Sequence, residues 1–448
     1  MSALADNRQA VNLVVGLGRT GFSVARHLVM RGEPVAVVDS RPSPPLLDRL
    51  REELPQAEWL GAFPASLPAD VGRLIVSPGV ASNEPLLTAA RRQGVDVLGD
   101  VELFARLARA PLVAVTGSNG KSTVVSLLAH LLDAPGYRVV PGGNLGRPAL
   151  ELLEEDADLY VLEVSSFQLE TTRSLDAAVG VILNLSPDHL DRHGDMAAYA
   201  GAKARLAAQS RIAVLNRDDE RVAAMAGLAR RIIWFGAGEP AADEFGLRSV
   251  EERCCFAHGE RVLGPADLPG LPGGHNRLNV LAALAAVHAL GLDPVAALAR
   301  LGSFHGLPHR MALVAERDGV RWINDSKATN LGATLAALAG LSEPVVLIAG
   351  GQGKGQDFTP LRPALAHSVR AVVLMGEAAD ALAAQVPEAV ALERATDMDQ
   401  AVTVAAGLAR PGDTVLLSPA CASFDLFDGF EARGRAFEQA VLARGGAA

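Results

Sequence analysis

Three short apolar runs, each rich in β-branched residues, end in a glycine-rich turn and pass into a stretch with helical spacing of apolar residues. They are VNLVVGLGRTG at 11–21, PLVAVTGSNGKST at 111–123 and VVLIAGGQGKG at 345–355. A strand, a glycine loop and a helix open a βα unit, and the loop lies at the carboxyl end of the strand, where open α/β sheets bind ligands. The pattern therefore predicts an α/β protein with three α/β domains.

The stretches between these units indicate where the domains divide. GVDVLGDVELF at 94–104 precedes the second strand, and the Gly-, Pro- and His-rich GSFHGLPHRM at 302–311 follows an Ala/Leu helix expected over about 279–290. We expect boundaries near 98 and 305. The domains are then a Rossmann-like domain at 1–98, a central P-loop domain with a parallel sheet at 99–305, and a Rossmann-like C-terminal domain at 306–448.

The composition and net charge of the chain indicate which kinds of molecule it can bind. The 448 residues are 49% hydrophobic, with a formal net charge of −10 and a pI near 5.5. Such an acidic chain is poorly matched to nucleic acid or to an anionic membrane, so we expect small-molecule partners and neither of those two. Three cysteines, two of them adjacent, fit neither a disulfide framework nor a zinc site. With no leader-like N-terminus and no apolar run of about 18 residues, we expect a soluble cytoplasmic protein.

The first glycine loop matches a dinucleotide fingerprint. In VVGLGRTG, Gly16, Gly18 and Gly21 would let the backbone approach a pyrophosphate. Asp39, at the end of the second strand, would reach a sugar or a base. A nicotinamide dehydrogenase, a site for another nucleotide and a tight turn without a ligand are all compatible with this loop.

The second glycine loop, VTGSNGKST at 115–123, indicates a triphosphate site. Backbone N–H groups from Gly117 to Lys121 at a helix N-terminus would cradle an anion, Lys121 would reach the β and γ phosphates, and the Ser122 hydroxyl would ligate Mg²⁺. The loop departs from the Walker pattern, because Val115 stands where that pattern has glycine. The intact GKST after a β-branched strand favours a variant P-loop over a chance turn.

Two further apolar runs end in residues suited to a metal ion or a phosphate. Glu163 closes the run in LYVLEVSSFQLE, where a buried strand would reach the ligand edge of the sheet; a glutamate paired with an arginine is the alternative. The segment ILNLSPDHLDRHG then offers histidines and carboxylates just after another strand: Asp188, His189, Asp191 and His193.

Lysine is rare in this chain, with four lysines among 41 Lys plus Arg: Lys121, Lys203, Lys327 and Lys354. Lysine, unlike arginine, can lose its proton near neutral pH. Lys203 is expected on a helix after the His/Asp segment, where a free ammonium beside Mg²⁺ would be repelled. Addition of CO₂ to its neutral amine would give a carbamate, an anion able to ligate the metal or to orient a ligand. An unmodified lysine in a structural ion pair is the alternative.

The last third of the chain becomes polar after the tryptophan-containing strand in PHRMALVAERDGVRWINDSKATN at 308–330. His309 and Arg310 follow a Gly-Leu-Pro turn, and Asp325 would hold ribose hydroxyls. Lys327 and Thr329 would hold anions. The third glycine loop and SPACASFD at 418–425 each end another apolar strand.

Nine segments, taken in order, resemble one family: TGSNGKST, GGNLG, LEVSSFQLE, SPDHLDRH, GGHNRLN, GLPHR, NDSKATN, GGQGKG and SPACASFD. The chain is similar, nearly end to end, to the Mur ligases of bacterial cell-wall synthesis. The P-loop and DHLDRH are shared with the wider family, which includes folylpolyglutamate synthases. WINDSKATN and LSPACASFD resemble the members that add D-glutamate.

The resemblance implies an ATP-dependent amide synthesis on three α/β domains. D-Glutamate would be added to UDP-N-acetylmuramoyl-L-alanine through an acyl phosphate and a tetrahedral intermediate, in peptidoglycan precursor synthesis. The implied small-molecule partners are these two substrates and ATP. The implied cofactors are Mg²⁺, as two ions, and a CO₂-derived carbamate on Lys203. We expect a monomer whose C-terminal domain closes over the central domain, hinging near 302–308, because water must be kept from the acyl phosphate.

The resemblance also implies roles for individual residues. Expected contacts of the UDP substrate are Arg19, Thr20, Asp39, Ser40, Arg41, Gly79, Asn144 and His189. Expected contacts of ATP are Gly117, Ser118, Asn119, Gly120, Lys121, Ser122, Thr123, Asn276, Asn279, Arg310 and Asp325. Expected contacts of D-glutamate are Lys327, Thr329, Lys354, Ser423 and Phe430. Expected catalytic residues are Lys121, Glu163, His189 and Lys203, and expected metal ligands are Ser122, Glu163, His189 and carbamylated Lys203.

Three other functions stay open on the sequence alone. A nicotinamide dehydrogenase would leave GKST, DHLDRH and the third domain without a role. A non-catalytic nucleotide-binding or regulatory module would bind nucleotide without acceptor-dependent release of ADP. A ligase that adds L-alanine or L-glutamate, or that uses another acceptor such as a folate, shares the ATP chemistry and is the nearest competitor.

Overall fold

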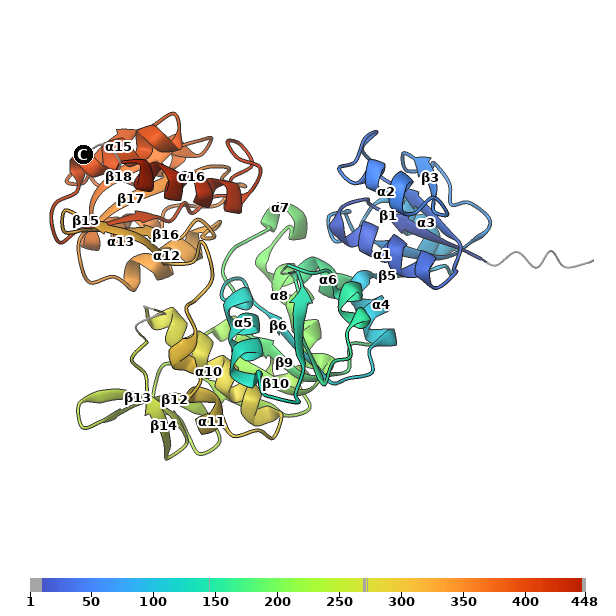
Figure 1. Ribbon diagram of the computed structural model, residues 1–448, viewed down its shortest axis with the longest axis horizontal. Helices are drawn as coiled ribbons and strands as arrows, with labels where there is room; N and C mark the ends of the chain where they lie inside the picture. Colours follow the sequence, from blue (N-terminus) through green and yellow to red (C-terminus); the bar gives the residue numbers. More distant parts are fainter. Residues whose placement is uncertain (1–9, 145, 269–270, 272, 445–448) are drawn as a thin grey trace, which may run out of the picture.

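The computed structural model describes residues 10–144, 146–268, 271 and 273–444, and their strands form three separate sheets (Figure 1). The sheets follow one another along the chain, and helices cover them. This arrangement confirms the α/β fold class that the three glycine loops predict. The divisions near 98 and 305 stay predictions, and the ends of the outer ranges, 1–9 and 445–448, lie outside the described residues.

The first sheet has five parallel strands in the order β3-β2-β1-β4-β5. Its elements are β1 (Val11–Val15), α1 (Arg19–Met30), β2 (Val35–Val38), α2 (Leu47–Glu53), β3 (Glu58–Gly61), β4 (Val71–Val76), α3 (Pro85–Arg92) and β5 (Asp96–Gly99). Along β1, Val14 belongs to the core with α1 and α2, whereas Leu13 and Val15 belong to the core with α3. The strand order reverses between β1 and β4, so the loop after β1 opens at the point where such sheets bind ligands.

The second sheet joins seven parallel strands to an antiparallel extension, in the order β14-β13-β12-β11-β10-β9-β6-β8-β7. Its strands are β6 (Leu112–Thr116), β7 (Val139–Gly143), β8 (Leu159–Glu163), β9 (Ala177–Ile182), β10 (Ser210–Asn216), β11 (Ile232–Phe235), β12 (Phe245–Val250), β13 (Arg253–His258) and β14 (Arg261–Pro265). Its helices are α5 (Lys121–Leu132), α6 (Ser166–Glu170), α7 (Leu190–His193), α8 (Met196–Ala208), α9 (Glu220–Ala223), α10 (Gly274–Ala289) and α11 (Pro294–Leu298). Val113 and Val115 of β6 pack with α5 and α10, whereas Leu112 and Ala114 share a core with α8.

The third sheet has the order β15-β16-β20-β17-β18-β19, and only the β15–β16 pair is antiparallel among its described pairings. Its elements are β15 (Ala312–Arg317), β16 (Val320–Asn324), α12 (Leu331–Ala339), β17 (Val345–Gly350), α13 (Leu361–Ser368), β18 (Val369–Met375), α14 (Ala379–Ala383), β19 (Ala391–Arg394), α15 (Met398–Leu408), β20 (Thr414–Leu417) and α16 (Phe430–Ala443). Helices α12 to α14 cover one face, and α15 and α16 cover the other.

The first and third sheets lie on opposite sides of α7, which projects from the central part of the molecule (Figure 1). Helix α4 (Asp100–Leu107) connects the first sheet to the second, and its Phe104 packs edge-on against Tyr160 of β8. Arg19 Nη2 also donates to the carbonyl oxygen of Gly146 at 2.6 Å. The N-terminal sheet is thus held on the central one by both a shared core and polar contacts.

Helix α10 begins earlier than its apolar residues suggest. The sequence predicts a helix over about 279–290, and the structure places it at Gly274–Ala289. The polar turn that precedes the apolar part is also helical, and its Asn276 and Asn279 line a cavity together with Asn119 and Gly120 of the phosphate loop. Among the described residues, no helix combines the length and the apolar character that crossing a bilayer requires.

A buried arginine organises the C-terminal sheet. Arg433 of α16 is 2% exposed, and all its hydrogen-bond acceptors are neutral oxygens. Its guanidinium donates to Ser326 Oγ at 3.0 Å, to Ser326 O at 2.9 Å and twice to Cys421 O at 3.1 Å. Burial lowers the pKa of Arg433 to about 10. The helix, the loop after β16 and the loop after β20 are therefore joined through one side chain.

Replacement of the Arg433 guanidinium should destabilise the part of the protein built on the C-terminal sheet. We expect Arg433→Lys to lower the free energy of unfolding by about 3 kcal/mol, because an ammonium cannot satisfy the same set of buried carbonyls. Arg435→Lys, an exposed position in the same helix, is the matched control and should change it by less than about 0.5 kcal/mol. Calorimetric unfolding compares the two, and equal transition temperatures would contradict this role of Arg433.

Candidate active site

The phosphate loop connects β6 to α5 at the carboxyl edge of the central sheet. Gly120 precedes α5 with φ +86°, and a Cβ there would collide with the side-chain oxygen of Asn279, so only glycine fits. The N–H groups of Ser118 and Asn119 donate to O and Oδ1 of Asn184 at 2.8 and 2.9 Å. Two of the N–H groups expected to bind an anion are thus already paired. The groups left for an anion are those at the N-terminus of α5, because the first N–H groups of a helix have no partner within it.

Lys121 is folded back over its own loop. Its Nζ donates to Gly117 O and Ser118 O, each at 2.9 Å. Burial lowers the pKa of Lys121, and the charge of Glu163 opposes that effect. The ammonium is therefore held beside the loop at a position from which a short movement reaches the space in front of α5.

Glu163 ends β8 beside this loop. Its Oε2 accepts from Ser122 Oγ at 2.6 Å, and its Oε1 accepts from Asn144 Nδ2 at 2.7 Å. Burial raises the pKa of the Glu163 carboxyl, but the charge of Lys121 and these two hydrogen bonds outweigh it, so the net shift is downward. Glu163 is therefore an anion held by hydrogen-bond donors, and the expected alternative of a direct arginine pair is not what its contacts show.

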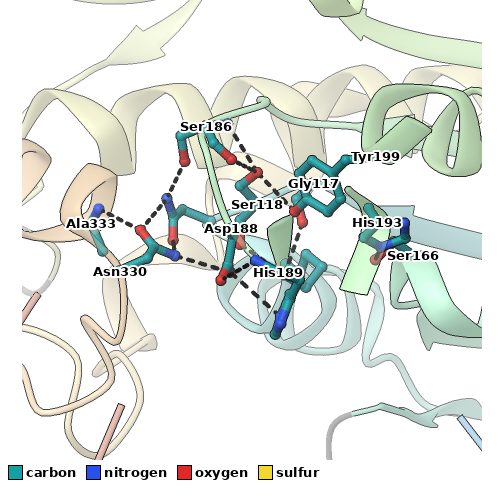
Figure 2. A network of polar contacts seen from close by, with 12 residues as sticks. Gly117, Ser118, Ser166, Ser186, Asp188, His189, His193, Tyr199, Asn330 and Ala333 are labelled. Atoms are coloured by element: carbon teal, nitrogen blue, oxygen red, sulfur yellow. Dashed lines mark hydrogen bonds and ion pairs between the residues drawn. The ribbon is translucent and has the colours of Figure 1, made fainter. Parts of the chain in front are cut away.

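The four His/Asp residues of the DHLDRH segment do not form one cluster. Asp188 Oδ2 lies 3.6 Å from His189 Nε2 and also contacts Asn330 (Figure 2). His193 turns away and contacts Ser166 of α6 at 3.0 Å, while Asp191 is exposed. The structure corrects the expected grouping, because His189 and His193 each pack against the ring of Phe167 and Asp191 is exposed. Burial lowers the pKa of His189, although the Asp188 charge opposes it.

Lys203, in the middle of α8, is 1% exposed. Its Nζ donates to Gly117 O at 2.9 Å and to Thr116 Oγ1 at 3.3 Å, and it lies 4.8 Å from the ring centre of Tyr199. Burial holds the pKa of Lys203 well below its usual range, and the nearby charge of Lys121 adds to this effect. Both hydrogen-bond acceptors are neutral oxygens, so its contacts do not support a structural ion pair.

Arg310 of the C-terminal part contacts the start of α5, whereas Asp325 is held by bonds within its own part. Arg310 Nη2 donates to Ser122 Oγ at 2.6 Å. Asp325, which follows β16, accepts from Ser418 Oγ at 2.9 Å and from Met311 N at 3.2 Å. Burial raises the pKa of Asp325 to about 7. Arg310, one of the residues expected to contact ATP, thus reaches the phosphate loop across 188 positions of sequence.

A cavity of about 330 Å³ lies between α5, α10 and α12. It is lined by seven of the residues expected to contact ATP: Asn119, Gly120, Thr123, Asn276, Asn279, Arg310 and Asp325. Leu183, Leu185, Phe235 and Leu271 add apolar walls. A cavity that combines polar and apolar walls in this way suits a purine ring attached to a phosphate chain.

A second cavity, of about 520 Å³, opens at the carboxyl edge of the first sheet. It is lined by seven of the eight residues expected to contact the UDP substrate: Arg19, Thr20, Asp39, Ser40, Arg41, Gly79 and Asn144. His189, the eighth, lies beside Asp188 instead. Burial alone would raise the pKa of Asp39, but hydrogen bonds from Arg41 and from the Leu17 N–H lower it to about 2.

The residues expected to contact D-glutamate surround the loop after β16. Lys327 Nζ lies 3.7 Å from the ring centre of Phe430, and burial lowers the pKa of this lysine to about 8. The Thr329 N–H donates to Lys327 O at 2.8 Å, and Ser423 is buried in the loop after β20. Lys354 follows β17 with φ +50°. A lysine charge beside an aromatic ring, as at Lys327 and Phe430, suits an anionic group such as a carboxylate.

Three residues that contact the site were missed by sequence reasoning. Tyr199 Oη lies 3.0 Å from Ser118 Oγ, and its position one helical turn before Lys203 is a signal that could have found it. The side-chain amide of Asn184 accepts from the N–H of Asn119 and donates to its carbonyl oxygen. Asn330 contacts Asn119 across 211 positions, and no local pattern indicates such a contact.

The donors around the phosphate loop fit a magnesium ion. Ser122 and Glu163 offer hydroxyl and carboxylate oxygens within hydrogen-bond distance of each other, and hard oxygen ligands are what Mg²⁺ prefers. Within the described ranges, no group of three or more His, Cys, Asp and Glu residues could hold a metal ion by itself. A metal here would therefore depend on ligands of other kinds, such as a hydroxyl, a phosphate or a modified lysine.

Three family profiles match the chain in succession. They are the Mur ligase MurD-like N-terminal domain over residues 10–99, the Mur ligase middle domain over 115–287, and the Mur ligase glutamate ligase domain over 309–421. The matched residues cover each of the three sheets. Together the three matches extend from residue 10 to residue 421 and leave only short stretches between them unmatched.

Curated relatives match over nearly their full length. The chain is 52% identical over 437 residues to the UDP-N-acetylmuramoylalanine–D-glutamate ligase of Nitrosococcus oceani, which covers 96% of both chains. It is 50% identical over 435 residues to the protein of the same name from Alcanivorax borkumensis, which covers 96% of this chain and 97% of the relative.

A solved structure shares the fold at low identity. The MurF ligase of Thermotoga maritima in complex with ADP superposes with a TM-score of 0.62 at 18% identity, over 92% of this chain and 96% of that one. The family profiles, the curated relatives and the three-sheet architecture agree. The chain belongs to the Mur ligase family.

Proposed function

We propose that this protein is an ATP-dependent ligase that joins D-glutamate to UDP-N-acetylmuramoyl-L-alanine in peptidoglycan precursor synthesis. The observation that carries the proposal is the position of Glu163, because one of its oxygens accepts from Asn144 of the N-terminal cavity and the other from Ser122 of the phosphate loop. A substrate that fills that cavity would end where the terminal phosphate of ATP lies. Relatives of 52% and 50% identity carry the name of this activity.

The first step is transfer of the γ-phosphoryl group to the carboxylate of the L-alanyl substrate. The carboxylate oxygen attacks phosphorus, ADP leaves, and an acyl phosphate forms. Lys121 and the N–H groups at the start of α5 offset the charge on the phosphate oxygens, and Arg310 approaches from the opposite side. Ser122, Glu163 and His189 would hold Mg²⁺, which when bound neutralises phosphate charge.

The second step is amide bond formation. The neutral amine of D-glutamate attacks the carbonyl carbon of the acyl phosphate, and the tetrahedral intermediate expels phosphate. Lys327, Thr329, Lys354, Ser423 and Phe430 would hold the amino acid, and the lysine charges match its two carboxylates. Nearby cations stabilise the oxyanion, because a positioned charge acts strongly in a site that excludes water.

Lys203 would act as a carbamate. Its ammonium and that of Lys121 donate to the same oxygen, Gly117 O, so two like charges are buried side by side. Formation of a carbamate replaces one of these cations by an anion and turns the repulsion into attraction. The carbamate would then orient Lys121 or a metal ligand, a role that arginine cannot fill because it keeps its proton.

The same proposal includes the partners and the setting. The protein would act as a monomer in the cytoplasm, with its two substrates and ATP as small-molecule partners and with neither nucleic acid nor a membrane. The net charge of −10 supports the exclusion of polyanionic partners.

The reaction is tested by ADP release with ATP, Mg²⁺ and UDP-N-acetylmuramoyl-L-alanine. We expect release to depend on D-glutamate and to be roughly 100-fold slower with L-glutamate, L-alanine or no amino acid, because a polar pocket discriminates strongly by geometry. Release without any amino acid would contradict ligation, and release with an L-amino acid would assign another product. If no amino acid supports ADP release, other acceptors should be tested, beginning with folates.

The carbamate is tested by two substitutions at one position. Lys203→Ala and Lys203→Arg should each lower kcat by roughly 100-fold or more, since a preorganised charge is lost. High bicarbonate or a small carboxylate should partly restore only the alanine variant, which leaves room for an added anion. Full activity in both variants would exclude the carbamate.

Arg205→Ala is the matched control for this experiment. Arg205 lies in the same helix, and its Nη2 donates to Thr172 O at 2.8 Å, away from the phosphate loop. This variant should keep its activity and show no response to bicarbonate. A Lys203 variant that loses thermal stability and is not rescued would assign a purely structural role to the lysine.

A further inference from the structure

A pair of side-chain amides joins the C-terminal part to the phosphate loop (Figure 2). Asn119 Nδ2 donates to Asn330 Oδ1 at 3.3 Å, and Asn330 Nδ2 donates to Asn119 Oδ1 at 3.1 Å. The Asn330 Nδ2 also lies 3.3 Å from Asp188 Oδ2. One side chain of the C-terminal part therefore contacts both the loop before α5 and the segment that carries His189.

Both of its partners are themselves fixed to the ATP site. The backbone of Asn119 is held by Asn184 through an N–H at 2.9 Å and a carbonyl at 3.0 Å. Asp188 accepts the N–H of His189 at 3.0 Å and lies 3.6 Å from its imidazole. A displacement of Asn330 would therefore shift Asn119 of the phosphate loop directly, and would shift His189 through Asp188.

Asn330 is also rigid on its own side. It is 3% exposed and caps α12, where its Oδ1 accepts from Ala333 N at 3.0 Å. The next residue, Leu331, donates its N–H to Gln356 Oε1 at 3.0 Å. Lys327 and Thr329 stand in the same short loop. The segment proposed to hold the amino acid therefore continues directly into the contact with the phosphate loop.

We infer that Asn330 is a positioning residue that transmits docking of the C-terminal domain, and with it the binding of the amino acid, to the phosphate loop and to His189. The inference deepens the proposed ligase activity and rests on it. Coupling of this kind is reciprocal, so the nucleotide should bind more tightly in the presence of D-glutamate, and D-glutamate more tightly in the presence of the nucleotide.

Helix capping is the competing explanation for Asn330, and one substitution separates the two roles. Asn330→Ser keeps an oxygen that caps α12 but is too short to reach Asn119 and Asp188. In the full-length protein we expect kcat for D-glutamate-dependent ADP release to fall roughly 10- to 100-fold. The transition temperature should stay within a few degrees of wild type. Unchanged kcat would overturn the inference, and so would a loss of activity that merely follows a loss of stability.

A double-mutant cycle with Asn119→Ala tests whether the amides act as a pair. If the two side chains work through one contact, the double variant should lose no more in kcat than the more damaged single variant. Losses that multiply would show independent roles and would overturn the inference.

Gly332→Ala gives a second test that leaves Asn330 intact. A Cβ at this position would lie 2.7 Å from Ser186 Oγ and 3.4 Å from Asn119 Nδ2, so it would push the two parts of the interface apart. Alanine is also a better helix former than glycine, so α12 itself should not be weakened. Gly407→Ala in α15 is the matched control, because a Cβ there meets no described atom within 4 Å.

Small-angle scattering completes the test. Wild type should become more compact with ATP, Mg²⁺ and both substrates, and Asn330→Ser and Gly332→Ala should compact less, while Gly407→Ala should behave as wild type. Identical profiles and equal kcat for all four proteins would overturn the inference. Wild type that shows no D-glutamate-dependent ADP release would instead overturn the proposed function, so the two failures are distinguishable.

Discussion

Two buried ammonium groups share one carbonyl oxygen, and much of the site depends on that contact. Lys121 and Lys203 both donate to Gly117 O at 2.9 Å in the loop after β6. Like charges at this separation repel strongly in a dry environment. Negative charges at Glu163 and Asp188 offset part of this repulsion, and Asn184 anchors the loop through the Asn119 N–H. Chemical modification of one lysine would relieve the remaining conflict.

Parallel sheets explain why the other groups meet at this point. β6, β8 and β9 run in the same direction, so their carboxyl ends deliver Thr116, Glu163 and Ile182 to one edge, and the loops beyond them carry the phosphate loop and Asn184. The C-terminal sheet presents the end of β16, with Asp325, to the same space. Each sheet thus contributes one edge, and the reacting groups collect where the edges face one another.

The functional residues at the ends of strands could be predicted from the sequence, because the patterns that mark them are local. The three glycine loops, Glu163 after its apolar run and Lys203 on its helix all follow from short patterns. The Asn119–Asn330 pair could not be predicted, since 211 residues separate the partners and the two motifs that contain them do not indicate that they meet. The His/Asp segment misled for the opposite reason: residues close in sequence have different polar partners, since His189 lies beside Asp188, His193 contacts Ser166 and Asp191 is exposed. Roles assigned through resemblance stay predictions where no contact tests them.

Arg433 has a further consequence that lies outside stability. Its guanidinium is satisfied by neutral oxygens of Ser326, Gly350, Cys421 and Ala422, so its positive charge is not cancelled by any hydrogen-bonded anion. That charge lies behind the loops that carry Lys327 and Ser423. The interior of the domain therefore places a positive charge beside the loops proposed to hold the amino acid. An anionic amino acid bound there would be attracted by this charge, in addition to any direct contact with Lys327.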